Sequence, residues 1–183
     1  MTKKSIRHKL ASYLFYKDHA NKKRSGAAIS IDRATNIGII YDSTSESNYE
    51  LVKSLVKEFR DDHKDVLALG FYNTKELPSS RFAKLGLDYF TKKDLSWKFK
   101  PNSVVITNFI DTRFDILICL NIEKSIPLKY IASMSEAKFK IGRYDEHYTY
   151  LYDLMISVDE STSLKQYIIQ TKYYLNQVKH EVG

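Results

Sequence analysis

The chain has 183 residues, of which 43% are hydrophobic and 13% aromatic, with 6 glycines and 3 prolines. This composition is typical of one folded domain and excludes a long disordered tract. The single cysteine, Cys119, excludes an intramolecular disulfide, and no apolar run reaches the ~20 residues that cross a membrane. Because the N-terminus also lacks a secretory signal pattern, we expect a cytoplasmic protein without a transmembrane segment.

Charge is concentrated at the start of the chain. The formal net charge is +7, and residues 1–24 contain 8 Lys or Arg but only one acidic residue. Residues 25–183 contain 21 basic and 21 acidic residues, which cancel. The opening segment is therefore the source of the whole net charge.

The opening segment has the pattern of an amphipathic helix. Residues 5–22 lack Gly and Pro, and one helical face collects apolar side chains, namely Ile6, Leu10, Tyr13, Leu14 and Ala20. Gly26 is a suitable residue to end this helix. We predict a basic helix over residues 1–26 and a single α/β domain over residues 27–183.

Strands alternate with helices through the rest of the chain. Apolar runs predict strands at 36–42 and 65–72, joined by a helix for which Ser47 and Glu50 form the expected capping box. Residues 73–103 have no regular pattern. The later predicted elements are strands at 102–110 and 114–122, a helix at 127–137, strands at 138–144 and 150–158, and a helix at 161–180.

This alternation predicts a doubly wound α/β fold, Rossmann-like or flavodoxin-like, with a mostly parallel sheet of about five or six strands. Ligands of such folds bind in the crevice at the carboxyl ends of the strands. Polar loops follow the predicted strands at 42–47, 73–75, 108–113, 121–125 and 143–147. The candidate crevice residues are Asp42, Ser43, Ser45, Asn121, Ser125 and Arg143.

The first of these loops, "IIYDSTSESNYE", resembles the phosphate loop of flavodoxins, where hydroxyl and backbone N–H groups at a helix N-terminus hold a phosphate. Flavodoxin loops contain glycines, whereas this loop has none and carries Asp42, Glu46 and Glu50. Carboxylates repel a phosphate and can satisfy the helix end themselves. We therefore expect these side chains to cap the helix.

Residues 113–144, "RFDILICLNIEKSIPLKYIASMSEAKFKIGRY", resemble a strand-helix-strand unit in the N-terminal half of heptosyltransferase-like glycosyltransferases. This resemblance implies a Rossmann-like fold and a nucleotide-sugar ligand. Residues 36–158 also resemble a family of uncharacterised hypothetical bacterial proteins of about this length, which implies the same architecture.

No motif of known catalytic chemistry is present in the sequence. There is no G-x-G-x-x-G, no Walker A loop and no H-E-x-x-H, and the five histidines lack the spacing of metal ligands. The catalytic residues, if the protein is an enzyme, are therefore unknown from the sequence, and we predict no metal and no cofactor.

Two stretches combine basic and aromatic residues. The first is residues 1–24, where Tyr13, Phe15 and Tyr16 could stack on bases, and the second is residues 81–100, with six basic and two acidic residues. In the second stretch we expect Phe90 and Trp97 to pack into the core. The candidate polyanion-binding residues are Lys3, Lys4, Arg7, Lys9, Lys17, Lys22, Lys23, Arg24, Lys92, Lys93 and Lys98.

The leading hypothesis is a non-catalytic protein that binds RNA or a ribonucleoprotein such as the ribosome through its basic helix. One alternative is an enzyme that binds a nucleotide or nucleotide-sugar in the strand-end crevice. Another is a peripheral membrane protein or complex adaptor whose helix lies on an anionic membrane surface. The simplest interpretation remains a helix that packs on the domain and leaves its lysines in water.

Overall fold

The structure is a computed structural model that describes Tyr13, Phe15 and Lys17 near the N-terminus. It further describes residues 26–78, 81, 86–97, 99–100, 102–121 and 125–178. This part of the chain forms an α/β fold built on one six-stranded sheet in which every strand pair is parallel. The strands are β1 (Asn36–Asp42), β2 (Asp65–Tyr72), β3 (Leu87–Thr91), β4 (Ile116–Cys119), β5 (Phe139–Arg143) and β6 (Leu154–Ile156).

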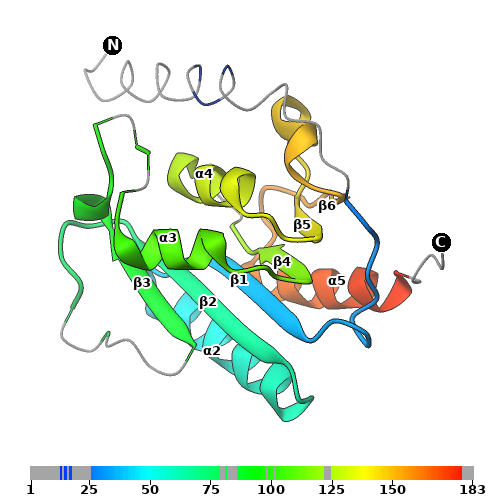
Figure 1. The fold of residues 1–183 in the computed structure, drawn as a ribbon. Coiled ribbons are helices and arrows are strands. Elements are labelled where there is room, and N and C mark those ends of the chain that lie inside the picture. The colour runs from blue at the N-terminus through cyan, green and yellow to red at the C-terminus, as the bar shows by residue number, and fades with distance from the viewer. Residues whose placement is uncertain are drawn as a thin grey trace.

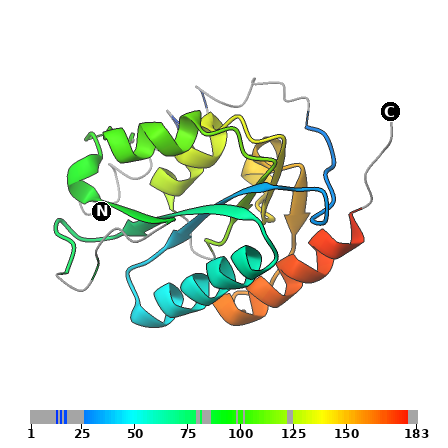
Figure 2. The same cartoon turned by 60° about the horizontal axis from the view of Figure 1, so that its bottom comes forward.

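Helices cover both faces of the sheet (Figures 1 and 2). On one face lie α2 (Glu46–Asp61) and α5 (Leu164–Gln177), and on the other lie α3 (Val104–Asp111) and α4 (Ile126–Met134). Two short 3-10 helices, η1 (Lys92–Asp94) and η2 (Glu146–Leu151), follow β3 and β5. In the described residues, no helix is both long and apolar enough to cross a membrane.

Alternation along the strands divides the core into two layers. Ile37, Ile39 and Tyr41 of β1 pack toward α2 and α5, whereas Ile40 packs toward α3 and α4. Gly38 also faces the second layer, because a Cβ at this position would lie 2.8 Å from the ring of Phe114. All five of these β1 residues are buried, as expected for a strand covered on both faces.

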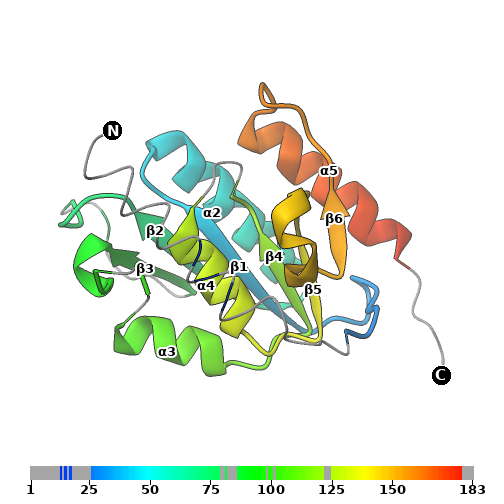
Figure 3. The ribbon, with the colours of Figure 1, turned by 90° about the horizontal axis from the view of Figure 1, so that it is seen from above.

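The strand order is β3-β2-β1-β4-β5-β6, which Figure 3 shows from above. This is the Rossmann order of two β-α-β halves that run outward in opposite directions from β1 and β4. The order decides between the two doubly wound folds expected from the sequence, in favour of the Rossmann-like one. The connections from β1 and β4 diverge, so a crevice forms between their carboxyl ends.

Two predicted elements were wrong. Residues 102–110, predicted as a strand, contain most of α3, because Ile106 and Phe109 are buried at helical spacing while Val104 and Val105 are exposed. Residues 73–103, predicted to be irregular, contain the edge strand β3, which pairs only with β2. The sheet therefore has six strands, although one of them is not where the sequence pattern placed it.

The predicted capping box of α2 was also wrong. The helix begins two residues earlier than expected, with Ser45 as its N-cap, and the Ser45 Oγ accepts a hydrogen bond from the Asn48 N–H at 3.2 Å. Ser47 instead lies inside the first turn, where its Oγ is 3.2 Å from that of Ser45.

Candidate functional site

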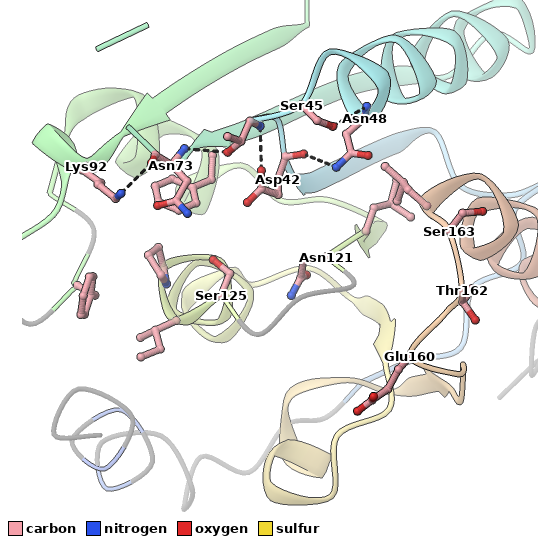
Figure 4. A pocket seen from close by; sticks show the side chains of 17 residues that line it. Asp42, Ser45, Asn48, Asn73, Lys92, Asn121, Ser125, Glu160, Thr162 and Ser163 are labelled. Carbon is pink, nitrogen blue, oxygen red and sulfur yellow. Dashed lines mark hydrogen bonds between the residues drawn. The ribbon is translucent and has the colours of Figure 1, made fainter. Parts of the chain in front are cut away.

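A cleft of about 620 Å³ lies at the carboxyl ends of β1 and β4, at the point where the strand order reverses. Side chains from the loops after five of the strands line it. Figure 4 shows Asp42 and Ser45 on one side, Asn121 and Ser125 on another, and Glu160, Thr162 and Ser163 on a third.

The β1–α2 loop is closed by its own side chains. The Asp42 carboxylate accepts a hydrogen bond from the Thr44 N–H at 2.8 Å, and the Asn48 amide donates to the Asp42 carbonyl at 3.3 Å. The Ser45 Oγ also accepts from the Asn48 N–H. The side chains of this loop therefore cap the N-terminus of α2, as its carboxylates and hydroxyls led us to expect.

A carboxylate in the first turn of α2 forms an ion pair beside this loop. Arg81 donates to both carboxylate oxygens of Glu46, at 3.2 and 2.6 Å. The hydrogen bond from Arg81 lowers the pKa of Glu46, so this carboxylate is ionised at neutral pH. The ion pair has no net charge, and the α2 end is a poor site for a phosphate because the Thr44 and Asn48 N–H groups already donate to Asp42 and Ser45.

The loops after β2 and β3 are linked to each other and to the first loop. The Asn73 N–H donates to the Thr44 Oγ1 at 3.0 Å, and the Lys92 Nζ donates to the Asn73 carbonyl at 2.7 Å. These bonds hold the Lys92 ammonium at the rim of the cleft as a positive charge.

The β4–α4 wall differs from the others because its polar residues are largely buried and yet have no side-chain partner among the described residues. Asn121 is only 9% exposed, and its side-chain amide forms no hydrogen bond with another described residue. The Ser125 Oγ is buried and has no hydrogen-bond partner in the described part of the chain, although Ser125 is the N-cap residue of α4. Residues 122–124, between these two, lie outside the described part of the chain.

The β6–α5 loop completes the cleft and was missed by the sequence prediction. Ser163 and Gln166 form a capping box in which the Ser163 N–H donates to the Gln166 Oε1 at 2.9 Å. The pattern S-x-x-Q at 163–166 was a usable signal for this helix start. Glu160 and Thr162 precede it and also line the cleft.

Part of the lining is apolar and aromatic. Phe71 at the end of β2 and Phe99 after η1 both line the cleft, together with Leu120 and Leu164. Phe99 has a backbone φ of 60°, in the left-handed region that costs a bulky residue about 1–2 kcal/mol. Backbone strain of this kind is found more often at functional sites than elsewhere.

Four of the six predicted crevice residues line this cleft, namely Asp42, Ser45, Asn121 and Ser125. Ser43 does not, because it is fully buried and its Oγ points toward Gly70 beneath the loop. Arg143 ends β5 and is also absent from the cleft lining. The predicted loop at 108–113 belongs to α3 and its exit, so it precedes β4 rather than following a strand.

Of the predicted polyanion-binding residues, the structure describes three. Lys17, Lys92 and Lys93 are exposed, and Lys93 forms an ion pair with Glu76 at 3.0 Å. The others lie outside the described residues: Lys3, Lys4, Arg7, Lys9, Lys22, Lys23, Arg24 and Lys98.

The roles expected for some aromatic residues are corrected by their burial. Phe15 is 1% exposed, with its ring 4.7 Å from that of Tyr130 in α4, so it cannot stack on bases. Tyr13, placed on the packing face by its spacing, is 63% exposed. Phe90 is buried as predicted, but Trp97 is 62% exposed rather than packed into the core.

No group of three His, Cys, Asp or Glu side chains among the described residues is placed to hold a metal ion.

Residues 3–178 match the model of a protein family described as "Family of unknown function (DUF6913)". No curated protein and no solved structure matches the chain.

Proposed function

Because the chain belongs to the DUF6913 family, whose function is unknown, we propose a function from the cleft: it binds a phosphate-bearing small molecule of the nucleotide class. The observation that carries this proposal is Asn121. This residue is 9% exposed, and its side-chain amide has no hydrogen-bond partner among the described residues and lies in a cleft at the strand-order reversal. Open α/β sheets bind their ligands at this reversal, and a buried amide without a partner is costly unless a ligand or water completes it.

The shape and lining of the cleft support the same ligand class. A volume of about 620 Å³ falls within the range of about 300–1,000 Å³ for small-molecule sites. The uncapped N-terminus of α4 and the Lys92 ammonium supply positive potential for an anionic group, while Phe99 offers aromatic surface to a base. The glycine-free first loop does not favour a dinucleotide bound in the Rossmann manner.

The test is thermal unfolding of the full chain against nucleoside mono-, di- and triphosphates, flavin nucleotides and nucleotide-sugars. A ligand at 100 times its Kd stabilises the folded state by about 2.7 kcal/mol. We expect one class to raise the melting temperature of the wild type, and Asn121→Leu to abolish that shift.

The matched control is Asn108→Leu, which changes an exposed asparagine on α3 and should keep the ligand response. A panel in which no compound raises the melting temperature of the wild type would contradict the proposal.

We propose a second function for the opening segment, which is binding of RNA or a ribonucleoprotein. It rests on the charge of residues 1–24 and on Phe15, whose buried ring attaches this segment to α4 while Tyr13 and Lys17 stay exposed. Neutralising phosphates releases counterions, so such binding weakens steeply as the salt concentration rises.

The test compares two full-length variants that each lose four positive charges. In one, Lys3, Lys4, Arg7 and Lys9 become Gln, and in the other the exposed Lys53, Lys57, Lys75 and Lys165 become Gln. We expect only the first to lose co-sedimentation with RNA or ribosomes at low salt, and equal binding by both would contradict this function. Pelleting with anionic vesicles but not with RNA would instead favour a membrane surface.

A further inference from the structure

Three helices begin at the cleft, and two of these N-termini are closed by their own side chains. At α2 the Ser45 Oγ accepts from the Asn48 N–H, and at α5 the Ser163 Oγ accepts from the Gln166 N–H at 3.3 Å. Their capping groups already occupy hydrogen-bond donors that would otherwise bind an anion.

The N-terminus of α4 is open. Its N-cap residue, Ser125, makes no side-chain capping hydrogen bond, and no acidic residue lies in the first turn. Pro127 at the second helical position has no N–H, and the backbone N–H groups of Ser125, Ile126 and Leu128 donate to no other described residue. These groups carry the positive end of the helix dipole.

Two polar side chains at this end of α4 also have no hydrogen-bond partner among the described residues. The Ser125 hydroxyl is buried and has no hydrogen bond to any described residue, and Asn121, which is 9% exposed as a residue, faces the cleft (Figure 4). A hydroxyl and an amide N–H₂ next to free backbone N–H groups match the oxygen atoms of a phosphate.

The charges around the cleft favour the same wall. Among the described lining residues, the carboxylates are Asp42 and Glu160, which belong to the β1–α2 and β6–α5 loops. The cation is Lys92, whose Nζ uses one of its donors on the Asn73 carbonyl. An anion placed at α4 therefore avoids the loops that carry both carboxylates.

We infer that the phosphate of the ligand binds at the N-terminus of α4, between Asn121 and Ser125, and not at the first β-α loop, where the sequence resembles a phosphate loop. This inference rests on the proposed function, since it assigns the phosphate of that ligand to one wall of the cleft. It makes Asn121 and Ser125 phosphate-binding residues and leaves Ser45 a structural cap.

The experiment is calorimetric titration of the full chain with ribonucleoside monophosphates, the matching nucleosides and inorganic phosphate. Asn121→Asp keeps the size of the side chain but places a carboxylate at the phosphate position. We expect it to weaken monophosphate binding more than tenfold while nucleoside binding changes less than twofold. Ser125→Ala should weaken monophosphate binding severalfold.

Three control variants separate this site from general charge and capping effects. Asn108→Asp introduces the same charge on the exposed face of α3, and Ser45→Ala and Ser163→Ala remove the caps of the other two helices. All three should bind the monophosphate within twofold of the wild type. Melting temperatures without ligand show whether each variant is folded.

The inference and the proposed function fail on different results. If monophosphates bind the wild type but Ser45→Ala weakens them and Asn121→Asp does not, the phosphate lies at α2 and the inference is wrong while the function stands. Nucleosides that bind as tightly as their monophosphates would also overturn only the inference. If no nucleotide binds, the proposed function fails. The inference then stands only if inorganic phosphate binds to the wild type and Asn121→Asp abolishes that binding; otherwise it is overturned as well.

Discussion

Asp115 joins three strands through one carboxylate at the end of the sheet opposite the cleft. Its Oδ2 accepts from the N–H groups of Thr35 and Asn36 at 2.9 and 3.1 Å, and its Oδ1 accepts from the Lys138 Nζ at 2.8 Å. Burial alone would raise the pKa of Asp115, but these hydrogen bonds outweigh it and lower the pKa to about 2.

Replacing this residue should make stability depend on pH in a defined way. A carboxylate whose pKa is lowered by folding stabilises the folded state above its unfolded pKa of about 3.9, and this contribution disappears as the pH falls toward 2. We expect Asp115→Asn to lower the free energy of unfolding at pH 7 by about 1–3 kcal/mol. Urea unfolding from pH 7 down to pH 2.5 should show this difference shrinking below pH 4.

The control for this prediction is Asp32→Asn at an exposed aspartate in the loop before β1. It should change the free energy of unfolding by less than about 0.5 kcal/mol at either pH. A difference between the wild type and Asp115→Asn that stayed constant from pH 7 to pH 2.5 would show that the ionised carboxylate is not the stabilising group.

At the scale of elements, replacing serine by alanine should affect stability differently at the N-termini of α5 and α4. Ser163→Ala removes a capping box and should destabilise the protein by about 1 kcal/mol. Ser125→Ala removes a buried hydroxyl that bonds to no described residue, so it should leave stability unchanged or raise it slightly. Urea unfolding of both variants without ligand tests this, and an equal loss in both would mean that Ser125 does cap α4.

The elements that the sequence predicted well are those with long buried runs or a clear amphipathic period, such as β1, β2 and α2. The α3 helix was mistaken for a strand because Val104, Val105 and Ile106 are β-branched, a residue class enriched in strands. The informative signal was the three-residue spacing of Ile106 and Phe109, which places both on one face of a helix. Packing of this face against the core outweighs the strand preference of the β-branched residues. The edge strand β3 is short and includes polar residues, so its pattern was weak.

The candidate site was partly predictable for a related reason. Residues that directly follow a strand, such as Asp42 and Asn121, were identified because parallel strands end at one edge of the sheet. Phe99 and Glu160 were missed because they lie several residues beyond the ends of their strands. Which of these loop residues reach the cleft depends on the strand order and on the course of the loops. A missing partner, as for Asn121, is likewise a property of the folded structure and has no sequence signal.

At the scale of the whole molecule, Phe15 connects the opening segment to the domain. Its ring belongs to the core layer formed with α3 and α4 and contacts Tyr130 and Tyr148. Removing a buried phenyl ring typically costs about 3–5 kcal/mol. We therefore expect Phe15→Ala to lower the free energy of global unfolding by about 3 kcal/mol, measured by circular dichroism in urea.

Tyr13→Ala is the matched control, since this neighbouring aromatic residue is exposed and its loss should cost less than about 0.5 kcal/mol. If Phe15→Ala unfolded at the wild-type urea concentration, the opening segment would be an appendage and not part of the cooperative unit.

The all-parallel sheet also affects how fast the protein folds and when the cleft forms. No pair of strands in it is a hairpin, and the hydrogen bond from Asn36 to Asp115, beside the β1–β4 pair, joins residues 79 apart. Contacts so distant in sequence give a high contact order, which slows folding. The chain entropy is lost when the long loops close, before the contacts between the strands contribute favourable free energy. The cleft lies over this central pair, so neither half of the sheet contains it, and a chain that has folded only one half has no binding site.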